Sequence, residues 1–401
     1  MKLRASLLMA TALTVISPLA ASAEIKFNAV PFPATDAAKR EIVTTDAVTL
    51  NGATGPLAYH TLARSGDVIG GVTFSQLTDQ NGDAVVGESE YGSVDADFTS
   101  LLTIGDKLFS ITHFESRPAA MYLSEVTQDA EGTLSYTSTK PIDFSSVGGL
   151  WVPCAGSVTP WMTHLKSEEY PADARAHFEA KELSDIDDYN YAMAAYFGVN
   201  PAEMTLEDFR GVYNPYQYGF PVEVTVTEVS KAMTDGHKGD LGGRNDVRLT
   251  ENNCGAVYEL PLDGNYVATA MRGVVAGIPT AYPVSSPYAG NACAIDGIAN
   301  PDNITYITGQ NTLLIGEDTG AGHQNDAAWA MDTQTGALTR IMTTPYGSEL
   351  TSLDWYEDVN GHGYLMAVVQ HPYGESDQDK AASPEDTRAY VGYVGPFPTT
   401  N

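Results

Sequence analysis

The sequence predicts an all-β fold, a β-propeller of about six blades with a helical insertion near residues 171–212. Apolar runs of about four to eight residues recur between Gly-, Asp- and Asn-containing turns, which is typical of short strands. From residue 219 onward no long helical pattern separates these runs, which argues against a doubly wound sheet. The chain has 401 residues and is long for a β-sandwich, so a propeller fits better.

The first 23 residues have the pattern of a secretory signal peptide. Lys2 and Arg4 precede an apolar stretch that ends in Ala-Ser-Ala, and this pattern predicts cleavage after Ala23. A membrane anchor is the alternative, but the apolar stretch is short for one. We therefore expect residues 24–401 to form one domain in the periplasm or outside the cell, with no membrane bound by the mature protein.

The charge balance is strongly acidic. The chain has 51 acidic and 21 basic residues and a net charge of −30, which argues against nucleic acid as a partner. Solubility is the simpler explanation for the acids, and the alternative is that some of them bind cations. We expect a monomer that acts on a small molecule.

Three cysteines remain after residue 23: Cys154, Cys254 and Cys293. An oxidising compartment favours disulfides, and an odd number leaves at least one thiol unpaired within the chain. We expect a Cys254–Cys293 disulfide and a free Cys154. Three buried free thiols are the alternative.

The chain before residue 171 reads as a series of strands. Residues 24–46 predict a first strand or a strap. Residues 98–116 contain two apolar runs joined by a Gly-Asp turn, and residues 120–138 predict a hairpin with its turn near Glu131 and Gly132. The segment Asp79–Asp83 is similar to part of a calcium loop, but it lacks the glutamate of an EF-hand, so a turn is expected there.

Residues 171–212 interrupt this pattern with two helical segments. Pro171 and Pro201 suit first-turn positions, and Asn200 suits an N-cap. The segment is short, so we expect an insertion without a core of its own. After residue 219 strand patterns resume, including a Thr-Gln-Thr-Gly turn typical of the short outer hairpins of propeller blades.

The usual nucleophile, zinc and P-loop motifs are absent from the sequence. Acids, a thiol and histidines instead follow apolar runs, and strand ends converge on the channel of a propeller. Each has a simpler interpretation: a single Glu at a strand end is usually solvated, an Asp can shape a turn, and Cys154 can be a small buried apolar residue. The candidates are Glu115, Cys154, Glu168, Glu169, His237, Glu251, Asp302, Glu317, Asp318, His371 and Glu375.

The order of these residues resembles that of the PhoX-type alkaline phosphatases, a family once known only as a domain of unknown function. Its pattern Cys-x-Gly-Gly-x-Thr-Pro-Trp-Gly-Thr-Trp-Leu-x-x-Glu-Glu is similar to CAGSVTPWMTHLKSEE at residues 154–169. Its closing Gln-His-Pro-Gly-Glu resembles QHPYGE at residues 370–375. Weaker similarities connect these two segments over roughly residues 100–376, and the chain is short for the larger members.

The resemblance implies a β-propeller with calcium and ferric iron in its channel and hydrolysis of small phosphate monoesters outside the cytoplasm. Cys154 is then the iron-bound thiolate. Such cations neutralise and polarise a phosphate and activate an oxygen nucleophile. The carboxylate ligands implied are Glu115, Glu168, Glu169, Glu251 and Glu375, to which we add Glu317 and Asp318.

The sequence also departs from the family pattern. Where the family has Gly-Arg-Phe-x-His-Glu, residues 234–238 are Thr-Asp-Gly-His-Lys, and Met162 and His164 replace a Gly and a Trp. We take His237 and Arg248 as candidate catalytic residues, with Arg248, like Arg244, otherwise a surface charge. Two alternatives to a phosphoesterase stay open: a propeller with structural calcium, and a lactonase-like or sugar-active propeller that does not need Cys154.

Overall fold

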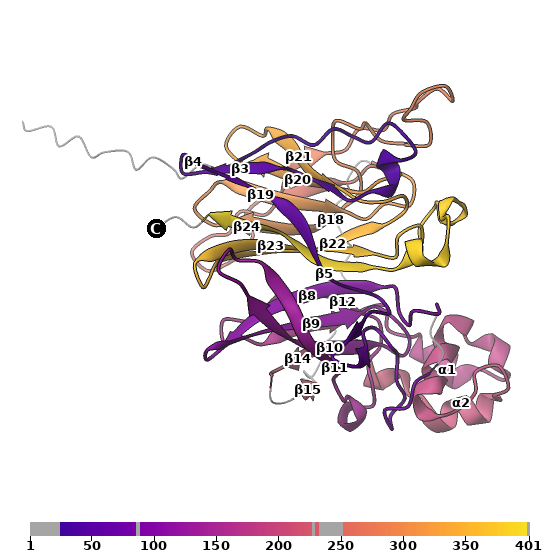
Figure 1. The fold of residues 1–401 in the computed structure, drawn as a ribbon. Coiled ribbons are helices and arrows are strands. Elements are labelled where there is room, and N and C mark those ends of the chain that lie inside the picture. Colours follow the sequence, from indigo (N-terminus) through magenta and orange to yellow (C-terminus); the bar gives the residue numbers. More distant parts are fainter. Residues whose placement is uncertain (1–24, 86–88, 227–228, 232–251, 399–401) are drawn as a thin grey trace, which may run out of the picture.

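The computed structural model of the chain describes residues 25–85, 89–226, 229–231 and 252–398. Antiparallel sheets dominate this part, and the helices gather in one lobe beside them (Figure 1). The predicted all-β class is confirmed. None of the described helices is both long and apolar enough to cross a membrane.

Four sheets have four or five strands each. The first consists of β8 (Ala96–Ile104), β9 (Lys107–Phe114), β10 (Ala120–Gln128) and β11 (Leu134–Pro141). The second consists of β12 (Pro153–Val158), β13 (His164–Glu168), β14 (Pro221–Val224) and β15 (Val229–Lys231). The third consists of β18 (Pro301–Ile307), β19 (Thr312–Glu317), β20 (Ala327–Asp332), β21 (Leu338–Thr343) and β2 (Val43–Thr44). The fourth consists of β22 (Glu349–Val359), β23 (His362–Gln370), β24 (Tyr390–Pro398) and β5 (Ala58–Arg64).

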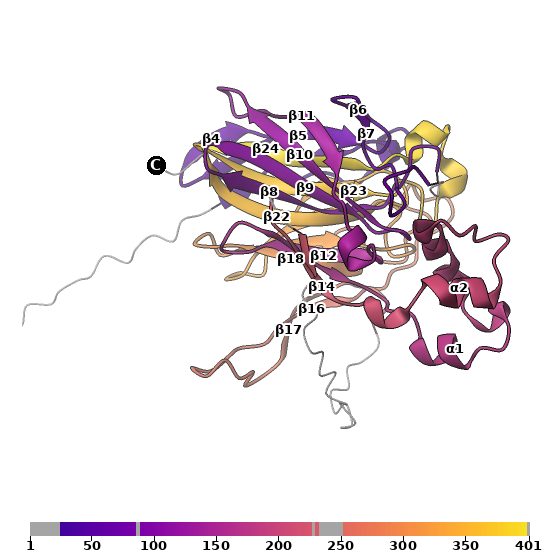
Figure 2. The same ribbon diagram turned by 90° about the horizontal axis from the view of Figure 1, so that it is seen from below.

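Smaller sheets complete the strand inventory of the described ranges. They are β1 (Ile25–Phe27) with β3 (Ala47–Leu50) and β4 (Ala53–Pro56), β6 (Val68–Ile69) with β7 (Val72–Thr73), and β16 (Ala256–Glu259) with β17 (Arg272–Ala276). The β16–β17 hairpin projects from the body of the molecule (Figure 2). The predicted hairpin turns after residues 104 and 128 are confirmed, as is the turn at Asp79–Asp83, where the Asp79 carboxylate accepts hydrogen bonds from the amides of Asn81 and Asp83.

Strands from the N-terminal part complete sheets made from the C-terminal part. β5 pairs with β24, from Tyr390 opposite Arg64 to Gly395 opposite Ala58, and β2 extends the third sheet beside β21. Pairing of a strand from the N-terminal part with the last strand, β24, closes a propeller ring without leaving an open edge there. The predicted strap of residues 24–46 is therefore confirmed by the position of β2.

The first strands of the four large sheets meet at the centre of the molecule. β8 contacts β12 and β22, and β22 contacts β18. A cavity of about 380 Å³ lies between these four strands and is lined by residues of each of them, including Phe98, Gly156, Asp302 and Leu353. The described ranges thus contain four large sheets whose first strands meet around one cavity, and the predicted count of about six blades stays a prediction.

The helical insertion joins β13 to β14. Its elements are α1 (Ala174–Glu179), η3 (Leu183–Asp185), η4 (Asp188–Phe197), α2 (Leu206–Val212) and η5 (Pro215–Gln217). The predicted helix starts are wrong: Asp173 caps α1 and Thr205 caps α2, while Asn200 accepts a hydrogen bond from the Ala202 amide in a turn. The capping oxygens at Asp173 and Thr205 satisfy first-turn amides, which outweighs the preference of proline for a first turn.

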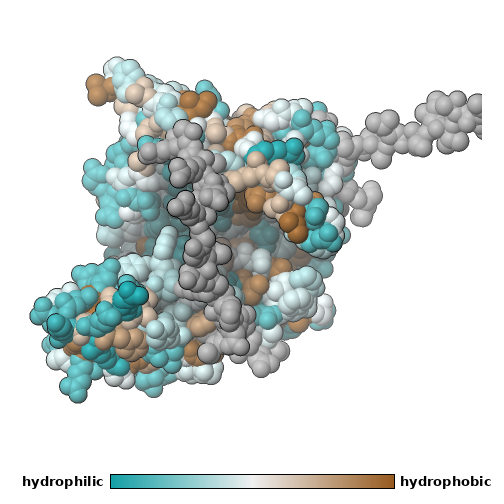
Figure 3. Space-filling model, turned by 180° about the vertical axis from the view of Figure 1, so that it is seen from behind, coloured by the Kyte–Doolittle hydropathy of each residue, from teal (hydrophilic) through white to brown (hydrophobic). Residues whose placement is uncertain are grey.

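The insertion also has a hydrophobic cluster of its own, which the sequence argument excluded. Met193, Phe209 and Tyr213 are buried there around Trp151, which precedes β12. Trp151 explains why this cluster forms. Its large aromatic side chain comes from the propeller and supplies buried apolar surface that the short insertion lacks. Seen from behind, the insertion protrudes as a lobe with hydrophobic and hydrophilic side chains intermixed (Figure 3).

Four further 3₁₀ turns lie at Ala38–Arg40, Ser145–Val147, Gln378–Lys380 and Pro384–Thr387.

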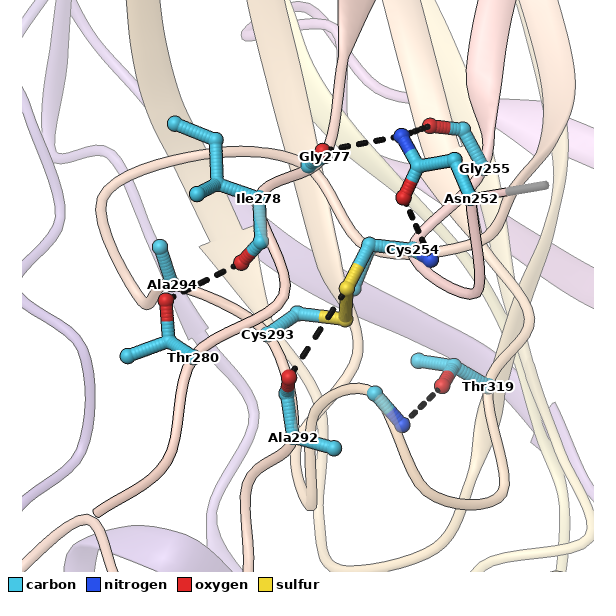
Figure 4. The surroundings of a disulfide bond; sticks show 12 residues. Asn252, Cys254, Gly255, Gly277, Ile278, Thr280, Ala292, Cys293, Ala294 and Thr319 are labelled. Atoms are coloured by element: carbon cyan, nitrogen blue, oxygen red, sulfur yellow. Dashed lines mark hydrogen bonds between the residues drawn. A yellow bond between two sulfur atoms is a disulfide. The ribbon is translucent and has the colours of Figure 1, made fainter. Parts of the chain in front are cut away.

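The cysteines follow the predicted pattern. Cys254 and Cys293 form a disulfide (Figure 4). Cys154 is free. The disulfide is buried, and the side chain of Asn252 supports it by accepting from the Cys254 amide and donating to the carbonyl of Gly277. It fastens the base of the β16–β17 hairpin to the loop before β18.

Candidate metal centre

Cys154 lies on the inner strand β12 and forms a compact group with two acids. Its Sγ and one carboxylate oxygen each of Asp97 and Glu115 all lie within 4.8 Å of one another. Asp97 comes from β8 and Glu115 follows β9, so three strands of two sheets supply the group. Cys154 and Glu115 were predicted from the sequence, and Asp97 was not.

The backbone of the inner strands explains why these side chains point into the channel. In each of the four large sheets, the pairing of the first strand with its neighbour contains a β-bulge. A β-bulge changes the direction of side chains relative to the alternation of a regular strand. The bulges lie between Ala96 and Thr99, Pro153 and Gly156, Pro301 and Ile304, and Thr351 and Asp354. Asp97, Cys154 and Asp302 are therefore all bulge residues of inner strands.

Asp97 is 2% exposed. Its Oδ1 accepts a hydrogen bond of 2.6 Å from Thr351 Oγ1. Its Oδ2 has no hydrogen-bond partner among the described residues, although His113 Nε2 lies 3.5 Å away. Buried carboxylate oxygens are nearly always satisfied, so an oxygen left over beside a thiol and a second carboxylate suits a cation.

Electrostatics in the group favour a cation as well. Burial raises the pKa of Glu115 to about 8, with a further contribution from Asp97, although Gln370 Nε2 donates a 2.9 Å hydrogen bond to the carboxylate. Burial also raises the pKa of the Cys154 thiol, and the carboxylates of Asp97, Glu115 and Glu169 add to this effect. A bound cation would reverse these shifts, because it favours thiolate and carboxylate over their protonated forms.

A second acidic group lies near the first. Burial raises the pKa of Asp318 to about 6, with Glu375 and Asp302 as the next causes. Burial likewise raises the pKa of Glu349, with contributions from Asp97 and Asp318. The carboxylate of Asp97 thus contributes to the raised pKa values of Glu115, Asp318 and Glu349.

His371 is a cation beside this second group. Its Nδ1 lies 3.2 Å from Asp95 Oδ1, and its Nε2 lies 3.3 Å from Glu375 Oε1. Burial alone would lower the pKa of His371, but hydrogen bonds to Asp95 and Glu375 raise it well above the ordinary value. The same contact with His371 lowers the pKa of Glu375. All three residues line a cavity of about 310 Å³.

Two predicted ligands lie outside these groups. Glu168 is buried and accepts hydrogen bonds from the amides of Trp151, Gly219 and Phe220, with Lys166 Nζ 3.9 Å away. Glu317 is fully buried and accepts from the amides of Ala299 and Ala327, from Trp329 Nε1 at 2.7 Å and from the ring of His323 at 2.9 Å. Hydrogen bonds within the protein use the oxygens of both carboxylates.

The remaining predicted residues divide between the pocket and the undescribed part of the chain. The carboxylate of Glu169 contributes to the raised pKa of the Cys154 thiol, and Asp318 and Glu375 belong to the second group. Glu251, His237 and Arg248, together with Lys238, Asp240 and Arg244, lie outside the described residues.

His164, one of the departures from the family pattern, belongs to a buried chain of polar side chains behind the thiol. His164 Nε2 lies 3.1 Å from His113 Nδ1, and His164 Nδ1 lies 2.9 Å from Ser100 Oγ. The Phe98 amide donates to His113 Nε2. Burial lowers the pKa of both histidines, so they are neutral and join β8, β9 and β13 as hydrogen-bonding residues.

Asp95, Asp97, Glu349 and Thr351 were missed because single acids or hydroxyls within apolar runs carry no motif. The signal that could have found them is positional: each lies in or just before an apolar run that becomes the first strand of a sheet. Such positions converge only when the sheets are arranged around a channel.

Fold and site together define a class: an all-β, propeller-type chain with a thiol and carboxylates gathered where its inner strands meet. No protein-family model matches the chain, and no curated protein matches it. Among solved structures it is similar to Pseudomonas fluorescens PhoX in complex with vanadate, a transition state analogue. That similarity covers 93% of this chain and 98% of the other, at 12% sequence identity and a TM-score of 0.45.

Proposed function

We propose that the protein is an exported, metal-dependent phosphoesterase that hydrolyses small phosphate monoesters. The observation that carries the proposal is the Asp97–Glu115–Cys154 group, with ligand atoms within 4.8 Å, inside a larger acidic pocket. A thiolate among carboxylates suits iron, and the oxygen-only group around Asp318 and Glu375 suits calcium. The resemblance of residues 154–169 to the pattern of PhoX-type alkaline phosphatases implies the same two metals, iron and calcium.

The chain's own residues would hold such cations in defined orientations. Gln370 orients Glu115, Thr351 orients Asp97, and His371 orients Glu375. When bound, the cations would neutralise a phosphoryl group and polarise it. Since the pocket is acidic, an anionic substrate would enter only with cations present. We assign the phosphate contact to Arg248 and proton transfer to His237 as part of the proposal.

Export is supported by the signal-peptide pattern of residues 1–23 and by the Cys254–Cys293 disulfide, which suits an oxidising compartment. The net charge of −30 supports a small-molecule substrate over nucleic acid or an anionic membrane. We propose that the mature protein acts as a monomer in the periplasm or outside the cell.

The test is hydrolysis of a chromogenic phosphate monoester by the full mature chain in calcium and ferric iron, with and without a chelator. Turnover that the chelator abolishes and added metal restores is expected. Cys154→Ser should remove bound iron, measured by elemental analysis, and should lower turnover by at least about tenfold. Metal-replete protein without chelator-sensitive turnover contradicts the proposal.

A second candidate is a propeller that binds calcium without phosphoesterase activity, as a structural ion or in a lactonase-like reaction. The group around Asp318, Glu375 and Asp302 supports it, because these ligands are oxygen only. Elemental analysis separates the two candidates: calcium without iron, unchanged by Cys154→Ser, favours this one.

A further inference from the structure

A cavity of about 450 Å³ lies in the helical insertion, apart from the acidic pocket. Its volume is within the range of small-molecule sites. Aromatic and apolar side chains make up most of its wall, with Asp173 and Asp187 at positions where they cap α1 and η4. The wall includes Tyr170, His177, Tyr189 and Tyr213.

The wall of the cavity is rigid and built of aromatic rings. Tyr213 is 1% exposed and stacks between Phe209 and Tyr218, at centroid distances of 4.8 and 5.3 Å and interplanar angles of 11°. The ring of His177 meets Tyr213 edge-on at 5.6 Å. Stacking covers both faces of the Tyr213 ring, so aromatic contact with a ligand falls to the exposed rings of Tyr170 and Tyr189.

Two buried polar atoms on this wall lack a hydrogen-bond partner within the described ranges: His177 Nδ1 and the Tyr213 hydroxyl. His177 is 1% exposed, and Arg210 donates to its backbone carbonyl rather than to its ring. Burial and then Arg210 lower the pKa of His177, so the imidazole is neutral and can donate or accept a hydrogen bond. Unsatisfied buried polar atoms are uncommon in native proteins, so a polar group of a ligand at this wall would supply a missing partner.

The cavity is connected to the candidate metal centre through two of its tyrosines. Tyr170, which lines the cavity, directly follows Glu169, whose carboxylate acts electrostatically on both Cys154 and Tyr170. Trp151 Nε1 fixes this segment by donating to the carbonyls of Glu169 and Tyr170 at 3.0 and 3.1 Å. The guanidinium of Arg117, two residues after Glu115, lies 3.1 Å above the ring centroid of Tyr189. Residues that lie close in the chain to Glu115 and Glu169 therefore contact or form the wall of this cavity.

We propose that this cavity binds a neutral, phenol-type aromatic ring, and that in the proposed reaction this ring is the alcohol part of an aryl phosphate monoester. The second half of this statement rests on the proposed function. The rings of Tyr170 and Tyr189 contact the aromatic group, and His177 hydrogen-bonds its polar substituent. Asp173 and Asp187 at the wall disfavour an anionic ring.

Binding of phenol to the full mature chain tests the first half without any reaction. Phenol and cyclohexanol are titrated in separate experiments, and ring-proton and tyrosine signals are followed by nuclear magnetic resonance. Phenol is expected to bind more tightly than cyclohexanol. His177→Phe, which keeps the ring packing, should weaken phenol binding about fivefold by removing one hydrogen bond. Tyr189→Ala should weaken it by about three- to tenfold.

Tyr216→Ala is the matched control, because Tyr216 is a tyrosine of the same insertion that is 67% exposed and lies outside the cavity wall. It should change phenol affinity by no more than about twofold. Thermal unfolding of each variant shows whether it is folded. Equal affinity for phenol and cyclohexanol, or folded cavity variants with unchanged phenol affinity, would overturn the inference.

Turnover separates this inference from the proposed function. If phosphatase activity is present, His177→Phe and Tyr189→Ala should raise KM for phenyl phosphate more than KM for a short alkyl phosphate. An unchanged KM ratio would overturn the assignment of the ring as the alcohol part. If activity is absent but phenol binding depends on His177 and Tyr189, the proposed function fails and the aromatic site stands.

Discussion

Glu168 and Glu169 are neighbours in the chain, yet their carboxylates have unrelated partners. Glu168 Oε2 accepts from the Gly219 amide at 2.9 Å and Oε1 from the Trp151 amide at 3.1 Å, whereas the carboxylate of Glu169 acts on the Cys154 thiol and helps to raise its pKa. Successive side chains of an extended strand point to opposite faces, so one glutamate holds the insertion against β13 and the other faces the channel. A paired-glutamate motif therefore combines a structural residue with a candidate ligand.

The first prediction uses this pair as a matched set. Glu168→Gln should lower the free energy of unfolding by about 2–4 kcal/mol, because a buried charged acceptor of amide hydrogen bonds is lost beside Lys166. Glu169→Gln should change stability by less than about 1 kcal/mol in the metal-free protein but should weaken metal binding. Urea unfolding and metal titration measure the two effects. Equal effects of both variants on metal affinity would contradict the assignment.

The second prediction concerns pH and the metal-free protein. The pKa of Glu115 is about 8 in the folded state, against an ordinary value of 4.5, and that of Asp318 is about 6, against 3.8. Both carboxyls bind a proton more tightly when folded, so their stabilisation is complete below the ordinary pKa and is lost as pH rises toward the raised pKa. His371 changes stability in the same direction at higher pH.

The melting temperature in chelator should therefore fall as pH rises from about 4.5 to about 8. Saturating calcium and iron should flatten or reverse this trend, because cations favour the ionised acids. Glu115→Gln should reduce the slope in chelator. A melting temperature that rises over this range in chelator, in the otherwise unchanged protein, would show that these acids do not control it.

The third prediction concerns the disulfide. Cys254 and Cys293 are separated by 39 residues, and closing a loop of that length stabilises a fold by about 4 kcal/mol in the chain-entropy description. The double substitution Cys254→Ala and Cys293→Ala should cost about this much, as should reduction of the folded protein. Cys154→Ala, which leaves the disulfide intact, is the control. A loss well under about 1 kcal/mol would argue against this role.

The fourth prediction tests the close approach at the channel. A Cβ added at Gly156 would lie 2.4 Å from Phe98 Cδ1, beside Asp97. Gly156→Ala should thus cost about 1–3 kcal/mol by overpacking and should weaken metal binding by displacing β8. Gly211→Ala, in α2 where a Cβ meets nothing within 4 Å, is the control and should be neutral or stabilising by up to about 1 kcal/mol. Calorimetry of both variants measures these changes in stability.

Local patterns allowed much of the fold to be predicted. The hairpins after residues 104 and 128 and the turn at Asp79–Asp83 depend on neighbouring residues, and all three are present. The helix starts were predicted at prolines, but Asp173 and Thr205 supply side-chain oxygens at the actual starts. The core of the insertion was missed because Trp151 reaches it from outside the segment.

The sequence by itself determined the strand-rich class and that at least one of the three cysteines is unpaired within the chain, because local periodicity and cysteine number carry that information. The structure then confirmed the expected Cys254–Cys293 disulfide and free Cys154. Only the tertiary structure decided which acids gather. Asp97 joins Cys154 and Glu115 through bulges in inner strands, whereas Glu168 and Glu317 are held by backbone amides. The physical reason is that ligation requires several side chains to point at one place, and in this chain that place is set by pairings as distant as that of β5 with β24.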